Sequence, residues 1–269
     1  ACQREEIHEQ QQAITDSIEY ATRIQTATLP PGKVLKNLLP KHFILYKPLQ
    51  IVSGDFYWLT KKQGKIIVAV ADCTGHGVPG AFMSMLGSAL LNDIVNNMEA
   101  LQANLILNEL RDRVISSLRQ TGEADEARDG MDISLCVIDR EHLNLQFAGA
   151  HNPLYHIRQG KLTELKADTM PIGISPETKK PFKNHQLSLR KDDTLYLFTD
   201  GYVDQFGGEK RKRFKTSRLK SLLFDMQDKN MSDQKTMLEQ TLHEWMGLSG
   251  LYEREYGQID DIIVMGIKV

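Results

Sequence analysis

The sequence predicts a single α+β domain preceded by a helix. Short runs rich in β-branched and aromatic residues recur from position 42 to the end of the chain and are typical of strands. Two segments, at about 79–97 and 103–119, instead carry apolar residues at helical spacing. The chain has 269 residues, of which 41% are hydrophobic, which is enough for one sizeable core and an appendage but short for two full domains.

The N-terminal segment is expected to form the appended helix. Residues 4–28 are polar and lack glycine and proline, and a weak heptad runs through Ile7, Ile14, Ala21 and Thr28. Two glutamines interrupt this short seam, so both a homodimeric coiled coil and an amphipathic helix folded onto its own domain stay open. The Pro-Pro-Gly sequence at 30–32 ends the helix, which makes residues 1–30 a linker. Because the chain begins at Ala1 rather than Met, we expect a fragment with an upstream sensor domain.

The segment 65–71 and the residues after it form the most informative stretch. Its six consecutive apolar residues are too few for a helix and predict a strand buried on both faces, after strands at 42–46 and 51–59. Asp72 stands at its end, glycines at 75 and 77 permit a tight turn, and Pro79 fits the first turn of a helix. A carboxylate at a buried strand end indicates a chemical role, although one such motif alone is more typical of a polar strand-to-helix connection.

Further carboxylates occur at similar places. Asp55 lies in the run 51–59, Asp200 follows an apolar strand, and Asp260 and Asp261 precede the final strand. Carboxylates gathered beside hydrophobic strands repel one another and lose hydration, so such a cluster needs a cation. Oxygen ligands without a cysteine and histidine set suit Mg²⁺ or Mn²⁺ better than zinc.

The rest of the chain supplies the other elements. Strands are expected at 131–138, 143–147, 154–157, 162–165, 186–189, 194–198 and 262–269, and helices near 219–226 and 233–246. His151 and Asn152 follow a strand end where a substrate could pass, although a hydrogen-bonded loop residue is the simpler interpretation of the histidine. The segment 209–220, rich in lysine and arginine, is interpreted as a solvated helix start rather than a nucleic-acid site.

Composition excludes several classes of protein. A net charge of −2 gives no general case for nucleic acid or an acidic membrane as partner. The cysteines at 2, 73 and 136 have no metal-binding or redox spacing, and their odd number argues against a disulfide framework, so a reducing cytoplasm is expected. No uninterrupted apolar run approaches the length of a membrane span, and no signal peptide is visible.

Taken together, the motifs resemble a known family. They are Gly54–Phe56, Ala71–Gly77, Ala148–Pro153, Thr199–Gly201 and Asp260–Asp261. In this order they resemble the metal-dependent protein serine/threonine phosphatases (PPM type), and more narrowly their bacterial SpoIIE-like branch, over about residues 40–269. The resemblance implies a four-layer α-β-β-α sandwich with two mainly antiparallel sheets, and residues 38–269 as the phosphatase domain.

The resemblance also implies a site for two divalent cations, Mn or Mg. Asp72 would bridge both ions, the carbonyl of Cys73 would bind one of them, Asp200 and Asp260 would hold the other, and Asp55 would bind directly or through water, with Asp55 and Asp72 counted as catalytic.

Two positions depart from the eukaryotic branch. Thr74 replaces a candidate general-acid histidine, with His76 two residues further on. The phosphate-binding arginine has no match, so Lys47 is a weak substitute, alongside His76, His151 and Asn152 as substrate-binding candidates.

The predicted function is hydrolysis of phosphoserine or phosphothreonine on a regulatory protein, which in this branch is typically an anti-sigma-factor antagonist. Two alternatives remain: a catalytically weak docking domain, and a phosphohydrolase of small phosphoesters. The presence of all five metal positions weighs against the first, and the lack of a dedicated pocket motif weighs against the second.

Overall fold

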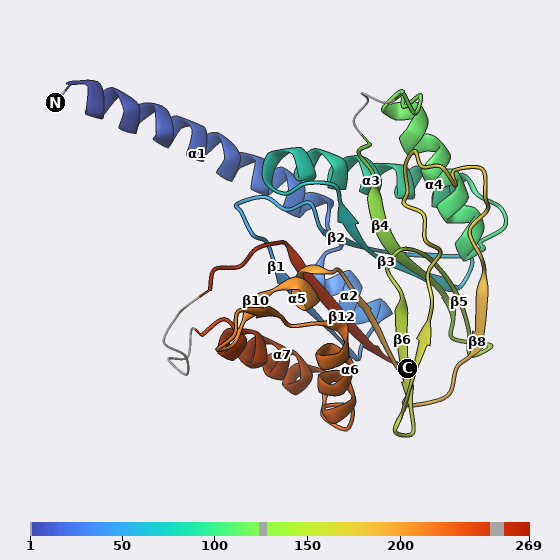
Figure 1. The fold of residues 1–269 in the computed structure, drawn as a ribbon. Coiled ribbons are helices and arrows are strands. Elements are labelled where there is room, and N and C mark those ends of the chain that lie inside the picture. Colours follow the sequence, from blue (N-terminus) through green and yellow to red (C-terminus); the bar gives the residue numbers. More distant parts are fainter. Residues whose placement is uncertain (1, 124–127, 248–255) are drawn as a thin grey trace.

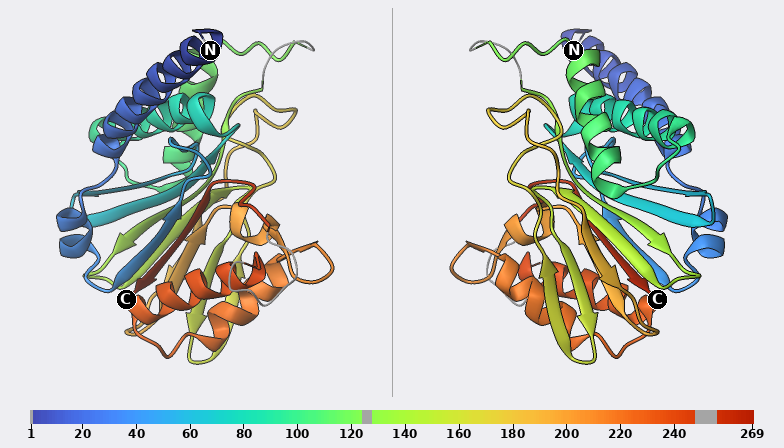
Figure 2. Two further views of the ribbon diagram at one scale, coloured as in Figure 1. Left: turned by 90° about the vertical axis from the view of Figure 1, so that its left-hand side faces the viewer. Right: turned by 90° about the vertical axis from the view of Figure 1, so that its right-hand side faces the viewer.

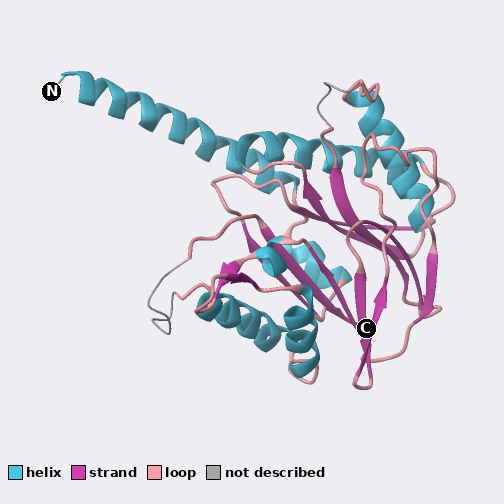
Figure 3. Cartoon of the chain, in the orientation of Figure 1, coloured by secondary structure: helices cyan, strands magenta, loops and turns pink. Residues whose placement is uncertain are grey.

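Two five-stranded antiparallel sheets stacked face to face form the centre of the computed structural model, which describes residues 2–123, 128–247 and 256–269 (Figures 1 and 3). The first sheet has the order β1 (His42–Lys47), β12 (Ile262–Lys268), β9 (Thr194–Phe198), β6 (Leu154–Arg158) and β7 (Lys161–Leu165). The second has the order β2 (Phe56–Lys62), β3 (Lys65–Cys73), β4 (Met131–Asp139), β5 (Asn144–Ala150) and β8 (His185–Ser188). A short hairpin, β10 (Phe206–Gly207) and β11 (Lys212–Arg213), stands apart from both sheets.

Helices cover the two outer faces of the sandwich. α3 (Gly77–Asn97) and α4 (Ala103–Ser117) pack on the second sheet, whereas α6 (Thr216–Asp225) and α7 (Met231–Trp245) pack on the first (Figure 2). A short helix, α5 (Gly201–Asp204), follows β9, and α2 (Gly32–Leu38) precedes β1. The predicted α-β-β-α sandwich is confirmed.

Strand β3 shows why the sequence forms these layers. Side chains of a strand alternate between its two faces. Ile67 and Ala69 therefore pack toward the helices, while Val68 and Val70 face the other sheet, and none of the four is exposed. This explains the continuous apolar run in the sequence.

Helix α1 (Cys2–Thr28) projects from the domain and joins it only near its C-terminal end (Figure 1). Ile7 and Ile14, on the predicted heptad seam, are 51% and 61% exposed, whereas Gln25 is 5% exposed and packs against the domain. The second half of the helix therefore packs onto the domain, whereas the coiled coil of the exposed first half stays a prediction.

Helix α3 is also long and apolar enough to cross a membrane by length and composition, although half of its apolar window is buried in the structure. Leu91, Ile94 and Val95 belong to the core cluster beneath it. A helix that packs into the core in this way is typical of a globular domain.

Two local predictions were wrong, and one short helix was missed. The run 51–59 is not one strand, because its first part is a loop held by side chains from distant elements and β2 begins only at Phe56. The basic segment 209–220 does not begin a helix until Thr216, because β10 and β11 form first. The short helix α2 was not foreseen in the stretch that follows Pro31.

Candidate active site

The predicted carboxylates meet at one edge of the sandwich. Asp72 lies near the end of β3, Asp200 follows β9 and Asp260 precedes β12, whose Val264 pairs with Phe198 of β9. Asp55 immediately precedes β2, whose first residue pairs with Ala71. A cavity of about 280 Å³ opens here, lined by Asp72, Cys73, Thr74, Gly75, His76, Arg128, Gly130, Met131, Asp132, Pro171, Asp200 and Asp260.

The electrostatics of this cluster favour bound cations. Burial raises the pKa of Asp55 and of Asp72, and repulsion from neighbouring carboxylates raises both further. Burial likewise raises the pKa of Asp200 and Asp260. One carboxylate oxygen of Asp55, Oδ2, is buried without a hydrogen-bond partner among the described residues.

These observations fit a divalent metal ion. A cation would pair with the unpartnered oxygen and offset the repulsion, and oxygen donors are those that Mg²⁺ and Mn²⁺ prefer. Within the described part of the chain, no three His, Cys, Asp or Glu side chains already surround one point.

The loop that carries Asp55 is held by two side chains from opposite ends of the chain. Asp261, which is 3% exposed, accepts hydrogen bonds from the backbone N–H groups of Leu49 and Gly54, both at 2.7 Å. Gln25 of α1 donates to the carbonyl of Ser53 at 2.6 Å and accepts from the Ser53 N–H at 3.1 Å. The position of Asp55 thus depends on both termini of the chain.

Glycines allow the metal-site loops to approach α3. A Cβ atom on Gly54 would lie 2.5 Å from the carbonyl oxygen of Gly75, and one on Gly80 would lie 2.3 Å from it. Gly75 itself has a φ of +82°, a conformation that side chains rarely adopt. Larger residues at 54 or 80 would therefore push apart the loops that carry Asp55 and Cys73.

Thr74 has a structural partner on the opposite rim of the cavity. Its hydroxyl accepts a hydrogen bond from the N–H of Gly130 at 3.1 Å, and its N–H donates to the Gly130 carbonyl at 3.0 Å. The residue that replaces the family's histidine therefore joins two loops.

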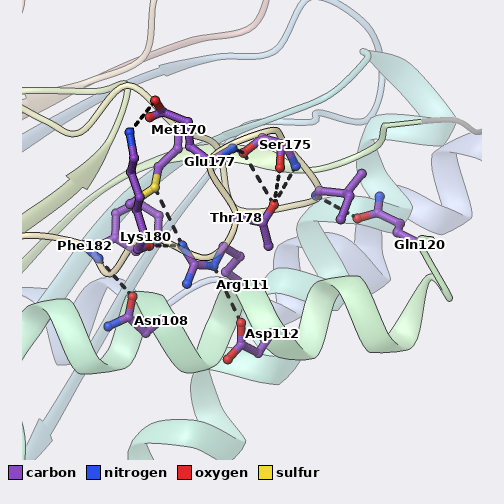
Figure 4. A network of polar contacts seen from close by, with 11 residues as sticks. Asn108, Arg111, Asp112, Gln120, Met170, Ser175, Glu177, Thr178, Lys180 and Phe182 are labelled. Carbon is purple, nitrogen blue, oxygen red and sulfur yellow. Dashed lines mark hydrogen bonds and ion pairs between the residues drawn. The ribbon is translucent and has the colours of Figure 1, made fainter. Parts of the chain in front are cut away.

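The loop over this rim, residues 166–184, is held from α4 and from the segment that follows it (Figure 4). Arg111, 5% exposed, donates to the carbonyl of Lys180 at 2.7 Å and lies 5.1 Å from the ring centre of Phe182. Gln120 donates to the carbonyl of Asp129 at 2.6 Å and accepts from the N–H of Ile174 at 3.0 Å. The rim is thus fixed to α4 and to the segment that follows it.

Asp132 lines the cavity and pairs with His151, which itself does not line it. Asp132 lies directly across the sheet from Asp72, and its Oδ1 is 2.8 Å from Nδ1 of His151. His151 has a φ of +55°, which is uncommon outside glycine and is often retained at functional sites. Its N–H donates to the Asp168 carbonyl at 2.9 Å, which fixes this turn.

The remaining predicted residues are distributed unevenly. His76 lines the cavity and lies close enough to Asp260 to oppose the rise in the pKa of that carboxyl. Lys47 ends β1 and does not line the cavity, while Asn152 is 7% exposed with its Nδ2 unpartnered among the described residues. The sequence reasoning missed Arg128, an exposed cation on the cavity wall, because it lies in a charged segment without a motif.

Known proteins share this sequence and fold. Residues 62–269 match the family described as Stage II sporulation protein E (SpoIIE). Phosphoserine phosphatase RsbU of Bacillus subtilis is 29% identical over 206 residues, which are 72% of this chain and 55% of RsbU. Phosphoserine phosphatase RsbP of the same organism is 28% identical over 162 residues, or 59% of this chain and 38% of RsbP. The chain therefore spans about half or less of the length of these relatives.

Solved structures extend the comparison. The PP2C domain of SiaA from Pseudomonas aeruginosa has a TM-score of 0.84 and 34% identity, with 96% of this chain and 98% of that domain covered. The PP2C phosphatase domain of SpoIIE from Bacillus subtilis has a TM-score of 0.64 and 20% identity, covering 85% of this chain and 63% of that one, which shows a common fold. The resemblance seen in the motifs is confirmed, and the chain belongs to the SpoIIE family of PP2C-type domains.

Proposed function

We propose that this chain is a metal-dependent phosphatase that hydrolyses phosphoserine or phosphothreonine on a regulatory protein. The observation that carries the proposal is the convergence of Asp55, Asp72, Asp200 and Asp260 at one edge of the sandwich, with an unpartnered buried oxygen on Asp55. The names of RsbU and RsbP as phosphoserine phosphatases support the same reaction.

Two divalent cations, Mn²⁺ or Mg²⁺, are proposed at this site. Asp72 and the Cys73 carbonyl are assigned to one side of the cavity and Asp200 and Asp260 to the other, with Asp55 as a direct or water-mediated ligand. When bound, such ions bind phosphate oxygens and lower the pKa of a coordinated water so that it can attack phosphorus.

The chain's own residues would bind and orient the phosphate monoester. Arg128 is the cation on the cavity wall suited to a phosphate oxygen, a role in which it replaces Lys47. His76, also on the wall, is a second donor toward the substrate. Asn152 is buried, and it supports the turn through its carbonyl, which accepts from Ser134 Oγ at 2.8 Å.

His151 is assigned to the leaving group. Nδ1 of the ring lies 2.8 Å from Oδ1 of Asp132, which orients the ring, and Nε2 would donate a proton to the serine oxygen that leaves phosphorus. Thr74 is occupied with Gly130, so it takes no part in this transfer.

The partner is proposed to be a phosphorylated bacterial signalling protein such as an anti-sigma-factor antagonist, with the reaction taking place in the cytoplasm. The exposed first half of α1 would connect to an upstream sensor domain and pair with a second copy of the chain.

Hydrolysis of p-nitrophenyl phosphate and of a phosphoserine protein, each with Mn²⁺ and with EDTA, tests the proposal. We expect Mn²⁺-dependent release of phosphate from both substrates. Full activity in EDTA would overturn metal dependence, hydrolysis of the aryl phosphate alone would favour a small-phosphoester enzyme, and the absence of turnover with Mn²⁺ would favour a docking domain.

A further inference from the structure

The segment that follows Asp200 carries a concentration of positive charge that the catalytic proposal does not use. Residues 210–220 contain no Asp or Glu, and their cations are Lys210, Arg211, Lys212, Arg213, Lys215, Arg218 and Lys220. The whole chain has a net charge of −2, so this concentration is local. We call residues 206–218 the basic hairpin.

Most of these charges have no carboxylate partner within the described residues. Only Arg213, with Asp204 at 3.0 Å, and Lys220, with Glu164 at 2.7 Å, form ion pairs there. Lys210, Lys212 and Lys215 are exposed. A surface of unpaired like charges attracts partners of opposite charge and speeds their encounter.

Aromatic rings hold the arginines of the hairpin in place. Arg218 lies 4.4 Å from the ring centre of Trp245, and Arg211 and Arg213 lie 6.0 and 5.9 Å from those of Tyr256 and Phe206. Guanidinium groups held over rings in this way lose less freedom when a partner binds. Two hollows of about 410 Å³ each adjoin this surface and share Arg218 and Trp245.

The basic hairpin is connected to the catalytic edge. Arg213 pairs with Asp204, whose N–H donates to the carbonyl of Asp200 at 2.9 Å, one helical turn away. Figure 2 shows the hairpin projecting from the same side of the sandwich as α5, with α2 on the opposite side.

These features define a docking surface. Building on the proposed function, we infer that the basic hairpin binds an acidic segment of the substrate protein next to its phosphorylated residue. One helical turn rises about 5.4 Å, and an extended peptide advances about 3.3 Å per residue. We place the acidic side chains that Lys210 and Lys212 would bind at the second to fourth positions from the phosphoserine, and the test peptides cover this range.

Two synthetic phosphoserine peptides test this inference. One carries aspartate at the second to fourth positions on both sides of the phosphoserine, and the other carries asparagine there. With Mn²⁺ at low ionic strength, we expect kcat/KM to be about tenfold higher for the aspartate peptide, the size of a few exposed ion pairs acting together. The preference should decline as salt is added, because the charges are exposed.

The double variant Lys210→Glu/Lys212→Glu should abolish or reverse the preference and leave turnover of p-nitrophenyl phosphate unchanged. The matched control is Lys33→Glu/Lys36→Glu, which makes the same change of charge on exposed lysines of α2 and should retain the preference. Unchanged aryl phosphate turnover in each variant also shows that it has folded.

The outcomes separate this inference from the proposed function. Equal rates on the two peptides, with intact Mn²⁺-dependent turnover of the aryl phosphate, would overturn the docking surface alone. A loss of preference in both double variants would also overturn it, since net charge rather than the hairpin would then be responsible. Duplex DNA binding in fluorescence anisotropy, lost in the hairpin variant and accompanied by equal peptide rates, would identify a nucleic-acid surface instead.

Discussion

Replacing Gln25 by alanine tests whether α1 controls the metal site. Gln25 is the side chain through which this helix holds the loop before Asp55, and it also donates to Ser84 Oγ of α3 at 2.9 Å. The substitution retains helix propensity, because alanine is the best helix former. Its effect should therefore arise at the loop rather than within α1.

The expected magnitude follows from the groups that lose partners. Ser53 is fully buried, and Gln25 is the acceptor for its N–H, whereas its carbonyl keeps a second contact with Ser84 Oγ at 3.3 Å. A buried N–H left without a partner costs about 1–3 kcal/mol. If the loop moves so that water reaches the N–H of Ser53, metal binding must return the loop to its original position. A cost of about 2 kcal/mol for that step corresponds to roughly thirtyfold weaker Mn²⁺ binding.

Calorimetric titration with Mn²⁺ measures this change. The matched control is Gln12→Ala, which removes an exposed hydrogen bond to Asp16 from the same helix. We expect the Kd to rise for Gln25→Ala and to stay at the wild-type value for Gln12→Ala. Equal Mn²⁺ affinity in the two variants would refute the reasoning, even if Gln25→Ala lowered the Tm, because the clamp would then stabilise the fold without positioning Asp55.

Three further predictions concern the site and α1. Asp72→Asn should lower Mn²⁺-dependent turnover at least about a hundredfold, since a bound metal ion supplies several kcal/mol of transition-state stabilisation. In EDTA we also expect the Tm of the unaltered chain to decline between pH 5 and 8, and Asp72→Asn should make this decline smaller. The decline follows because the pKa of Asp72 in the folded chain is raised above its ordinary 3.8, so that in this pH range the unfolded chain binds fewer protons than the folded chain and becomes more favourable as the pH rises. A pH-independent Tm in EDTA would contradict this reasoning. His151→Asn, which tolerates the positive φ, should slow hydrolysis of a phosphoserine peptide about a hundredfold but affect p-nitrophenyl phosphate little, because nitrophenolate leaves without a proton; equal losses on both would indicate a structural role. Deleting residues 1–17 should convert a dimer to a monomer in analytical ultracentrifugation, and an intact chain that is monomeric at high concentration would count against the coiled coil.

The layers of the fold could be predicted because the strands that build them are unusually apolar. A run such as 66–71 is buried on both faces, and only a position between a sheet and helices provides that. The loop at 51–55 could not be predicted in the same way. Backbone N–H groups of this loop donate hydrogen bonds to the side chains of Gln25 and Asp261 instead of to a neighbouring strand. These two side chains lie beside the loop only in the tertiary structure.

The residues of the candidate site also differ in how far the sequence alone predicts them. Asp72, Asp200 and Asp260 could be located because each stands beside an apolar strand and the antiparallel register brings those strand ends to one edge. Arg128 carries no such local signal, and Asp132, which flanks Gly130 at a strand entry, is more typical of a surface turn. Arg128 is one charge in a polar segment, and Asp132 becomes informative only when β4 pairs with β3 and places it opposite Asp72.

The tertiary contacts also bear on the domain boundary that the sequence predicts after residue 30. A linker that ended there would be separable from the domain, yet Gln25 is as buried as core residues and holds the loop of a proposed metal ligand. A deletion of residues 1–28 would therefore remove both the predicted dimer seam and this clamp, and its effect on activity would have two causes. Because Ile7 and Ile14 are exposed while Gln25 is buried, a rotation or shift of the exposed half can reach the Asp55 loop through a continuous helix. If the proposed upstream domain acts through α1, its signal would change metal affinity, and the comparison of Gln25→Ala with the deletion of 1–17 distinguishes that coupling from dimerisation.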